Sequence, residues 1–159
     1  MTINGELDLF SHAINPLLGL LALLLPLSRG HRATIQRSRY YAALVSVVLL
    51  AYVWMYFERK YQWWEHVWGV TFSTHTAVHV AILSGLWQFG RRWRVAAVFI
   101  GVAYALLMVY RHYHAPSDIA LTAIAMLPEL ILVWWFARAR RSPDLRSNAR
   151  SRPAELPTR

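Results

Sequence analysis

The run VWGVTFSTHTAVHVAILSGLWQFG, from Val67 to Gly90, decides the fold class of this chain. It contains 24 residues without one Asp, Glu, Lys or Arg. Because a helix needs roughly 17–25 mostly apolar residues to cross a bilayer, the run predicts a transmembrane helix. Its first half also carries Ser, Thr and His side chains. Such groups are costly at membrane depth, so this helix is also the first place to look for function.

Four other runs along the chain have the same apolar character. They hold no charged residue except Glu129, and they cover residues 9–27, 40–57, 95–110 and 119–137. Hydrophobic types make up 57% of the 159 residues and charged types 16%, whereas an ordinary soluble domain is about a quarter charged. This composition excludes a soluble enzyme, and the absence of Cys excludes thiol catalysis and a disulfide scaffold.

The sequence therefore predicts an all-α fold: a polytopic membrane helix bundle with five transmembrane helices. We expect a single transmembrane domain over residues 1–137, with helices at about 9–27, 40–57, 67–90, 93–112 and 117–137. Residues 138–159 are rich in Arg, Ser and Pro, which predicts a basic, disordered cytoplasmic tail.

The basic residues predict the orientation of the bundle. The segments 28–39, 91–94 and 138–159 hold four, three and seven Arg residues, whereas the opposite side has only Arg59, Lys60 and Arg111. Positive residues concentrate on the cytoplasmic side of membrane proteins. We therefore expect the N-terminus outside and the C-terminus in the cytoplasm of a bacterial inner, or plasma, membrane. The same distribution explains the net charge of +9 without a nucleic-acid partner.

Two polar groups of residues fall on the predicted outer face. His75 lies near the start of the third apolar run, and His114 and Asp118 lie between the fourth and fifth. Residues four apart share a face if the chain winds helically, so Asp118 is expected to contact His114. A carboxylate bonded to one imidazole nitrogen makes the other nitrogen more basic.

Two facing imidazoles, one of them backed by a carboxylate, suit in-line transfer of a phosphoryl group. One imidazole attacks phosphorus and the other protonates the leaving oxygen, so we expect His114, His75 and Asp118 to be catalytic. Phosphate oxygens need hydrogen-bond donors and cations, which the start of a helix and basic side chains supply. The candidates for phosphate binding are Ser73, Thr74, Arg111, Arg59 and Lys60.

At these residues the sequence resembles the type 2 phosphatidic acid phosphatase superfamily. FSTHTA at residues 72–77 is similar to the P-S-G-H motif of that superfamily, and closer to the F-S-G-H-T variant of its sphingomyelin synthase branch. HAPSDI at residues 114–119 is similar to its H-Y-P-S-D-V segment. The resemblance covers roughly residues 59–137.

The resemblance implies an integral membrane lipid phosphatase or phosphotransferase without metal or other cofactor. It would act on a lipid phosphate or similar amphiphile at the outer leaflet through a phosphohistidine. It implies His114 as the nucleophile, Asp118 as its partner, His75 as the general acid and Ser73 as a phosphate ligand. The sequence departs from the pattern at Met108, where the superfamily has an Arg, and no K-x6-R-P motif follows Lys60.

Two other interpretations stay open. One is a catalytically inactive lipid-binding or partner subunit, which the missing basic motif residues favour. The other is a histidine-bound metal protein, because His79 follows His75 by four residues and His112 and His114 lie on the same side. Interhelical hydrogen bonding is the ordinary role of a buried His such as His79.

Overall fold

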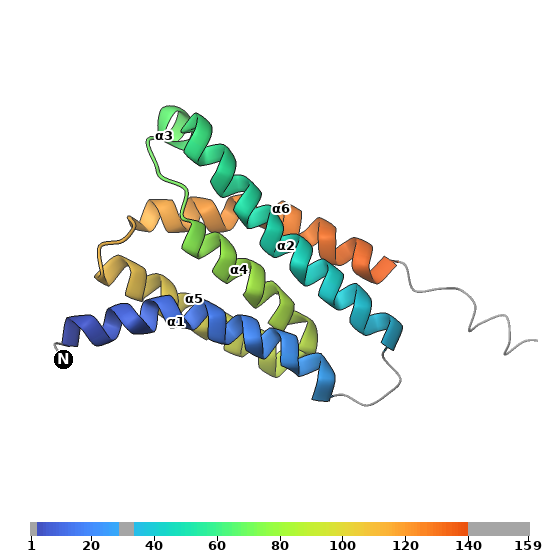
Figure 1. The fold of residues 1–159 in the computed structure, drawn as a ribbon. Coiled ribbons are helices and arrows are strands. Elements are labelled where there is room, and N and C mark those ends of the chain that lie inside the picture. Colours follow the sequence, from blue (N-terminus) through green and yellow to red (C-terminus); the bar gives the residue numbers. More distant parts are fainter. Residues whose placement is uncertain (1–2, 29–33, 140–159) are drawn as a thin grey trace, which may run out of the picture.

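The computed structural model describes residues 3–28 and 34–139, and these residues form helices and short connections without a strand (Figure 1). The predicted all-α class is therefore confirmed for the described part of the chain. The elements, in chain order, are α1 (Ile3–Leu24), η1 (Leu25–Ser28), α2 (Thr34–Tyr61), α3 (Trp63–Trp68), α4 (Thr74–Leu86), η3 (Trp87–Phe89), α5 (Arg91–Tyr110) and α6 (Pro116–Ala139).

Helix α4 is the centre of the bundle. It packs against α1, α2, α5 and α6, and most of its residues are buried, including Ala77, Ala81 and Leu86 at 0% exposure. Small side chains let the neighbours approach closely: a Cβ added to Gly85 would lie 2.9 Å from Leu44 Cδ1 and 3.0 Å from Tyr40 Oη. Close approach at small residues is a common way for membrane helices to pack.

The third predicted helix differs from the structure. The sequence predicted one helix over residues 67–90, but the chain forms the short α3, an extended connection over residues 69–73, and then α4. The first break is at Gly69, whose left-handed φ of 63° ends α3, and the second is at Ser73, whose extended backbone begins α4. The 13 residues of α4 rise only about 20 Å. Hydropathy alone does not reveal the breaks at Gly69 and Ser73.

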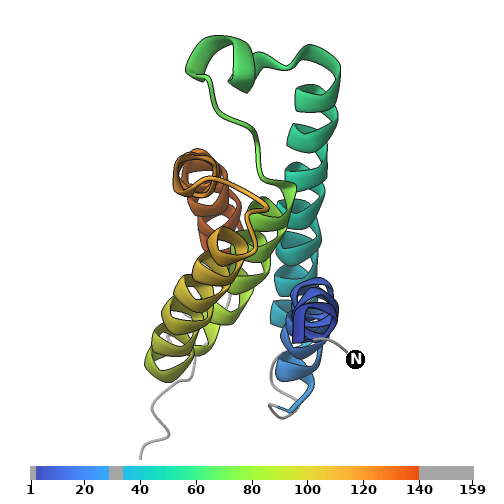
Figure 2. The same cartoon turned by 90° about the vertical axis from the view of Figure 1, so that its left-hand side faces the viewer.

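The helices alternate in direction, so their connections gather at two ends (Figure 1). One end holds the start of α1, the link from α2 through α3 to α4, and the link from α5 to α6. Figure 2 views the molecule from this end, where the 69–73 connection descends between α2 and α6 to reach α4. The other end holds the starts of α2 and α5 and the last residues of α6.

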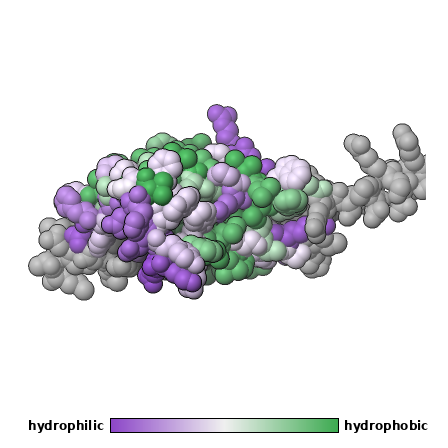
Figure 3. Space-filling view, turned by 90° about the horizontal axis from the view of Figure 1, so that it is seen from above, coloured by the Kyte–Doolittle hydropathy of each residue, from purple (hydrophilic) through white to green (hydrophobic). Residues whose placement is uncertain are grey.

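Three of the described helices are long and apolar enough to cross a membrane: Arg37–Tyr61 within α2, α5 and α6. A shorter apolar stretch, Ala13–Leu27, belongs to α1 and η1. Large apolar side chains are exposed on the surface, such as Phe99 at 71% and Ile131 at 67%. Hydrophobic side chains spread over the middle of the face in Figure 3, and hydrophilic ones gather mostly toward its ends. An exposed apolar surface of this kind suits lipid as solvent.

The predicted number of five spans and the predicted orientation go beyond these helices and stay predictions. Arg29 and Arg32, which contribute to the orientation argument, and the basic tail beyond residue 139 lie outside the described residues.

Candidate functional site

Asp118 lies in the first turn of α6 and is held by four polar contacts. Its Oδ1 accepts the backbone N–H of Thr71 at 3.1 Å, and its Oδ2 accepts the Thr71 hydroxyl at 2.9 Å and the Ala115 N–H at 3.2 Å. The residue is only 9% exposed. Pro116 occupies the first position of α6, where proline is favoured. Asp118, two residues later, accepts the N–H of Ala115, the residue before the helix, as the acidic residue of a capping box does. The helix dipole also favours negative charge here.

His114 supplies the fourth contact. Its Nδ1 lies 3.7 Å from Asp118 Oδ2, and the two side chains are 19% and 12% exposed. This separation is ion-pair distance and slightly longer than a hydrogen bond. Because Nδ1 faces the carboxylate, Nε2 is on the far side of the ring. The arrangement has the orientation expected of a carboxylate that fixes a tautomer.

The regions of the two motif segments, whose residues His75 and His114 are 39 positions apart, are hydrogen-bonded to each other here. Thr71 immediately precedes FSTHTA and bonds Asp118, while the N–H of Ser73 donates to Thr122 Oγ1 at 3.0 Å. Thr122 is 0% exposed and lies one turn after Asp118 on α6. Sequence reasoning assigned no role to Thr71 or Thr122. For Thr122 the signal was its i to i+4 spacing from Asp118, which places two polar groups on one face of an apolar helix.

Ser73 has a structural role that the sequence did not predict. Its side chain is 0% exposed, and its Oγ accepts the N–H of Thr76 at 3.3 Å and lies 2.9 Å from Thr76 Oγ1. These are the contacts of a helix N-cap. The Ser73 hydroxyl is therefore bonded inside the protein and caps the start of α4, while its role as a phosphate ligand stays a prediction.

His75 lies in the first turn of α4 and is exposed. Its backbone oxygen accepts the Asn15 side-chain N–H at 3.4 Å, so α1 contacts this turn. His79, one turn further along α4, is only 2% exposed. Its Nδ1 lies 2.6 Å from Asn15 Oδ1, and its ring stacks on Tyr104 with centroids 4.0 Å apart. His79 is thus a packed, hydrogen-bonded residue between α1, α4 and α5.

The three candidate cations do not share one position. Arg111 ends α5, and its guanidinium lies 5.9 Å from the ring centroid of Tyr113. Arg59 and Lys60 lie in the last turn of α2 and are exposed, with Lys60 Nζ 5.1 Å from the Tyr61 ring centroid. Met108, at the position of the superfamily Arg, is 2% exposed and packs in a small apolar cluster with Tyr104 and Ile119.

The part of the chain that the structure describes contains no group of three or more His, Asp and Glu side chains able to hold a metal ion. The geometry gives a reason for this result. His79 is turned toward Asn15 and Tyr104, while His114 is turned toward Asp118, so two of the four histidines of the metal interpretation face different partners.

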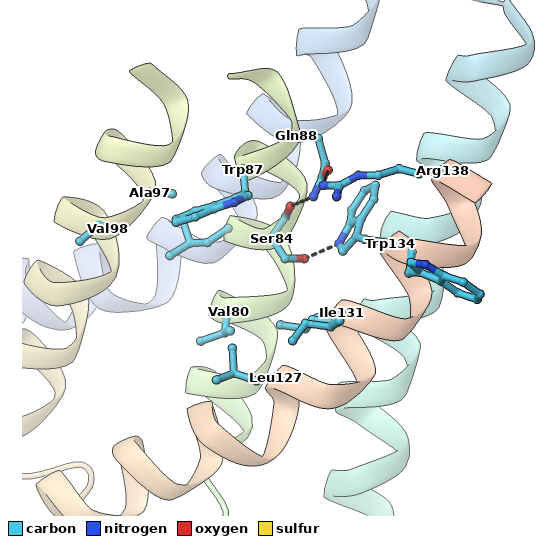
Figure 4. Close-up of a pocket in the computed structure, with 13 residues that line it drawn as sticks. Val80, Ser84, Trp87, Gln88, Ala97, Val98, Leu127, Ile131, Trp134 and Arg138 are labelled. Carbon is cyan, nitrogen blue, oxygen red and sulfur yellow. Dashed lines mark hydrogen bonds between the residues drawn. The ribbon is translucent and has the colours of Figure 1, made fainter. Parts of the chain in front are cut away.

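The structure also contains apolar cavities away from His114. One, of about 520 Å³, lies between α4, α5 and α6 at the end opposite Asp118 (Figure 4). In that view Trp134 donates to Ser84 Oγ at 2.9 Å, and Arg138 contacts Gln88 near the end of α6. Another, of about 570 Å³, lies between α2, α3 and α6 and includes Trp54 and Glu129.

The fold and the exposed apolar surface together define an α-helical protein that associates with a membrane. No family model, curated protein or solved structure matches the chain.

Proposed function

We propose that this protein is an integral membrane lipid phosphatase or phosphotransferase that works through a phosphohistidine on His114. The observation that carries the proposal is the anchored pair of His114 and Asp118. The carboxylate faces His114 Nδ1 and is held by Thr71, so it joins the HAPSDI segment to the residue immediately before FSTHTA. The same two segments carry the resemblance to the type 2 phosphatidic acid phosphatases.

In the proposed reaction, His114 Nε2 attacks the phosphorus of a lipid phosphate monoester. A bond forms between Nε2 and phosphorus, and the bond from phosphorus to the lipid oxygen breaks. His75 gives its proton to the departing oxygen, so the lipid leaves as a neutral alcohol. His75 then removes a proton from water, or from an acceptor alcohol, which attacks the phosphohistidine and restores His114.

Asp118 acts on Nδ1 throughout this cycle. It orients the ring, keeps the proton on Nδ1 and stabilises the positive charge that develops on the imidazole. Backbone N–H groups in the first turn of α4, with Thr74, bind the phosphate oxygens, and Ser73 contributes by capping that turn. Arg111 supplies positive charge, joined by Arg59 and Lys60 from the end of α2.

The proposed orientation places this site at the outer leaflet of a bacterial inner membrane, within five transmembrane helices. The helix directions support it. The last turn of α2, the end of α5 and the start of α6 lie on one side of the molecule, and the start of α5 and the last turn of α6 lie on the other (Figure 1). The latter two carry Arg91, Arg92, Arg94 and Arg138. The short α4 crosses as the buried centre of the bundle, with η3 extending it.

The test is phosphate release by the purified full chain in nonionic detergent. The substrates are phosphatidic acid, a sphingoid phosphate and a polyprenyl phosphate, each measured with and without a diacylglycerol acceptor. His114→Ala should abolish turnover, because it removes the attacking atom, and Asp118→Asn should leave partial activity. His112→Asn is the matched control: His112 is exposed and has a φ of 55°, which Asn tolerates. Equal activity of wild type and His114→Ala would refute the assignment.

A catalytically inactive lipid-binding or partner subunit is the second candidate. The observation that favours it is the apolar packing of Met108, where the superfamily has a basic residue. This candidate predicts no phosphate release from any substrate and unchanged lipid binding in His114→Ala.

A further inference from the structure

The cavity between α2, α3 and α6 has an unusual lining for an apolar membrane protein. Its volume is about 570 Å³, within the range of small-molecule sites. Aromatic rings form most of the wall, and two carboxylates, Glu58 and Glu129, are part of it. No Lys or Arg belongs to the described residues that line it. The lining therefore combines aromatic surface with two carboxylates, and Lys60 Nζ lies at its edge, 5.1 Å from the ring centroid of Tyr61.

The aromatic residues enclose the cavity from two sides. Trp54 and Trp64 meet edge to face with centroids 6.4 Å apart, and Trp64 is only 7% exposed. Nearer the surface, Phe57 and Tyr61 stack at 6.0 Å, and both are about half exposed. Aromatic faces attract cations through their quadrupoles. The rings are thus fixed inside the cavity and accessible at its mouth.

Glu129 indicates the kind of ligand that the cavity binds. Its Oε1 accepts the indole N–H of Trp54. Its Oε2 is buried, and no donor among the described residues reaches it. A buried carboxylate oxygen without a partner is destabilising, because the interior does not replace its lost hydration. Glu58, in contrast, already accepts the backbone N–H of Trp64 at 3.1 Å.

We propose that this cavity binds an organic monocation: an ammonium-type group on an apolar body. The positive centre lies against Glu129 Oε2, Trp54 and Trp64 surround it, and the apolar part lies toward Phe57 and Tyr61. A zwitterionic lipid head group fits less well, since the lining has no basic side chain for its phosphate. Glu129 follows Asp118 by eleven residues, a rise of about 17 Å along α6. The site is therefore separate from the His114 pair and does not depend on the proposed phosphatase activity.

The experiment is equilibrium dialysis of the full chain in nonionic detergent against radiolabelled tetraphenylphosphonium, with protein-free micelles as the blank. We expect saturable binding to one site. Unlabelled benzyltrimethylammonium should displace the label, whereas tetraphenylborate, which has the same shape and the opposite charge, and phosphocholine should not. No saturable binding above the blank, or equal displacement by tetraphenylborate or phosphocholine, would overturn the proposal.

Variants locate the site. Glu129→Gln keeps an acceptor for Trp54 and nearly the same volume but removes the charge. Its dissociation constant should rise by about 10- to 100-fold, the usual value of one interaction with a charged group. Glu65→Gln is the matched control, because Glu65 is an exposed acid of α3 that does not line the cavity. Unchanged binding by Glu129→Gln, or equal loss in both variants, would contradict the assignment.

A third variant guards against misfolding of Glu129→Gln. Trp63→Ala alters a lining residue that is 54% exposed, so it removes cavity wall with little effect on the core. It should weaken binding several-fold and leave the elution volume and helical circular dichroism unchanged. Wild-type affinity in Trp63→Ala would also count against the proposal.

Discussion

Replacement of Ser73 by Ala should destabilise the bundle because the hydroxyl is an internal cap. The change removes the acceptor of the Thr76 N–H, a loss typically of about 1 kcal/mol for an N-cap. It also strands the Thr76 hydroxyl, which is buried together with Ser73. A buried polar group without its partner costs about 1–3 kcal/mol, although the Thr76 hydroxyl regains part of this by bonding a backbone carbonyl three or four residues before it. We expect a total of about 2–3 kcal/mol.

The assay is equilibrium unfolding of purified wild-type and variant protein in mixed micelles, followed by circular dichroism. Ser46→Ala is the matched control: Ser46 is an exposed residue of α2 whose hydroxyl bonds only the Ala42 carbonyl, at 2.8 Å. It should change stability by less than about 0.5 kcal/mol. Equal stability of Ser73→Ala and wild type would refute the capping role. An intact fold with a raised KM alone would restore Ser73 as a phosphate ligand.

Three further predictions concern packing and chemistry. Gly85→Ala should destabilise the bundle by about 1 kcal/mol net. The new Cβ would lie 2.9 Å from Leu44 and 3.0 Å from Tyr40. Overpacking costs about 1–3 kcal/mol, which exceeds the gain in helix propensity from Gly to Ala. Gly19→Ala, whose Cβ would meet only Ile82 at 3.8 Å, should be neutral or stabilising in the same unfolding assay. If Gly19→Ala were instead the more destabilising of the two variants, α2 and α4 would not be packed this closely. Thr122→Val should cost about 1–3 kcal/mol because it strands the buried Ser73 N–H, and wild-type stability would argue against the link between α4 and α6. Phosphate release should persist in excess chelator and be inhibited by orthovanadate, which imitates the in-line transition state on His114. Activity lost to chelator and restored by one divalent metal would favour the histidines as metal ligands.

Charge and hydropathy predicted the helical class and the approximate position of most helices, because both signals accumulate over about twenty residues. The third helix was the exception. Its break depends on two single residues, the left-handed Gly69 and the capping Ser73, and a run of uncharged residues does not register either one. The short central α4 is stabilised by burial among four other helices, which is a tertiary effect.

In the candidate site, too, sequence spacing predicted the local contact and missed the long-range ones. The i to i+4 spacing predicted that Asp118 would be near His114, and the two side chains do lie 3.7 Å apart. The spacing did not predict that Thr71 would hold the carboxylate, because that contact joins residues 47 positions apart. Nor did it predict the stacking of His79 on Tyr104. Long-range partners of polar residues depend on how helices cross, and a single sequence carries little information about that.

The most direct test of the central claim is to trap the phosphoryl group on His114. The full chain is mixed briefly with a lipid phosphate carrying ³²P in its phosphate group, then quenched in alkaline detergent and digested. We expect a base-stable, acid-labile label on the peptide that contains His114. The label should be present in His112→Asn and absent from His114→Ala. Turnover by wild-type protein without a labelled peptide, or label retained by His114→Ala, would show that His114 does not carry the phosphoryl group.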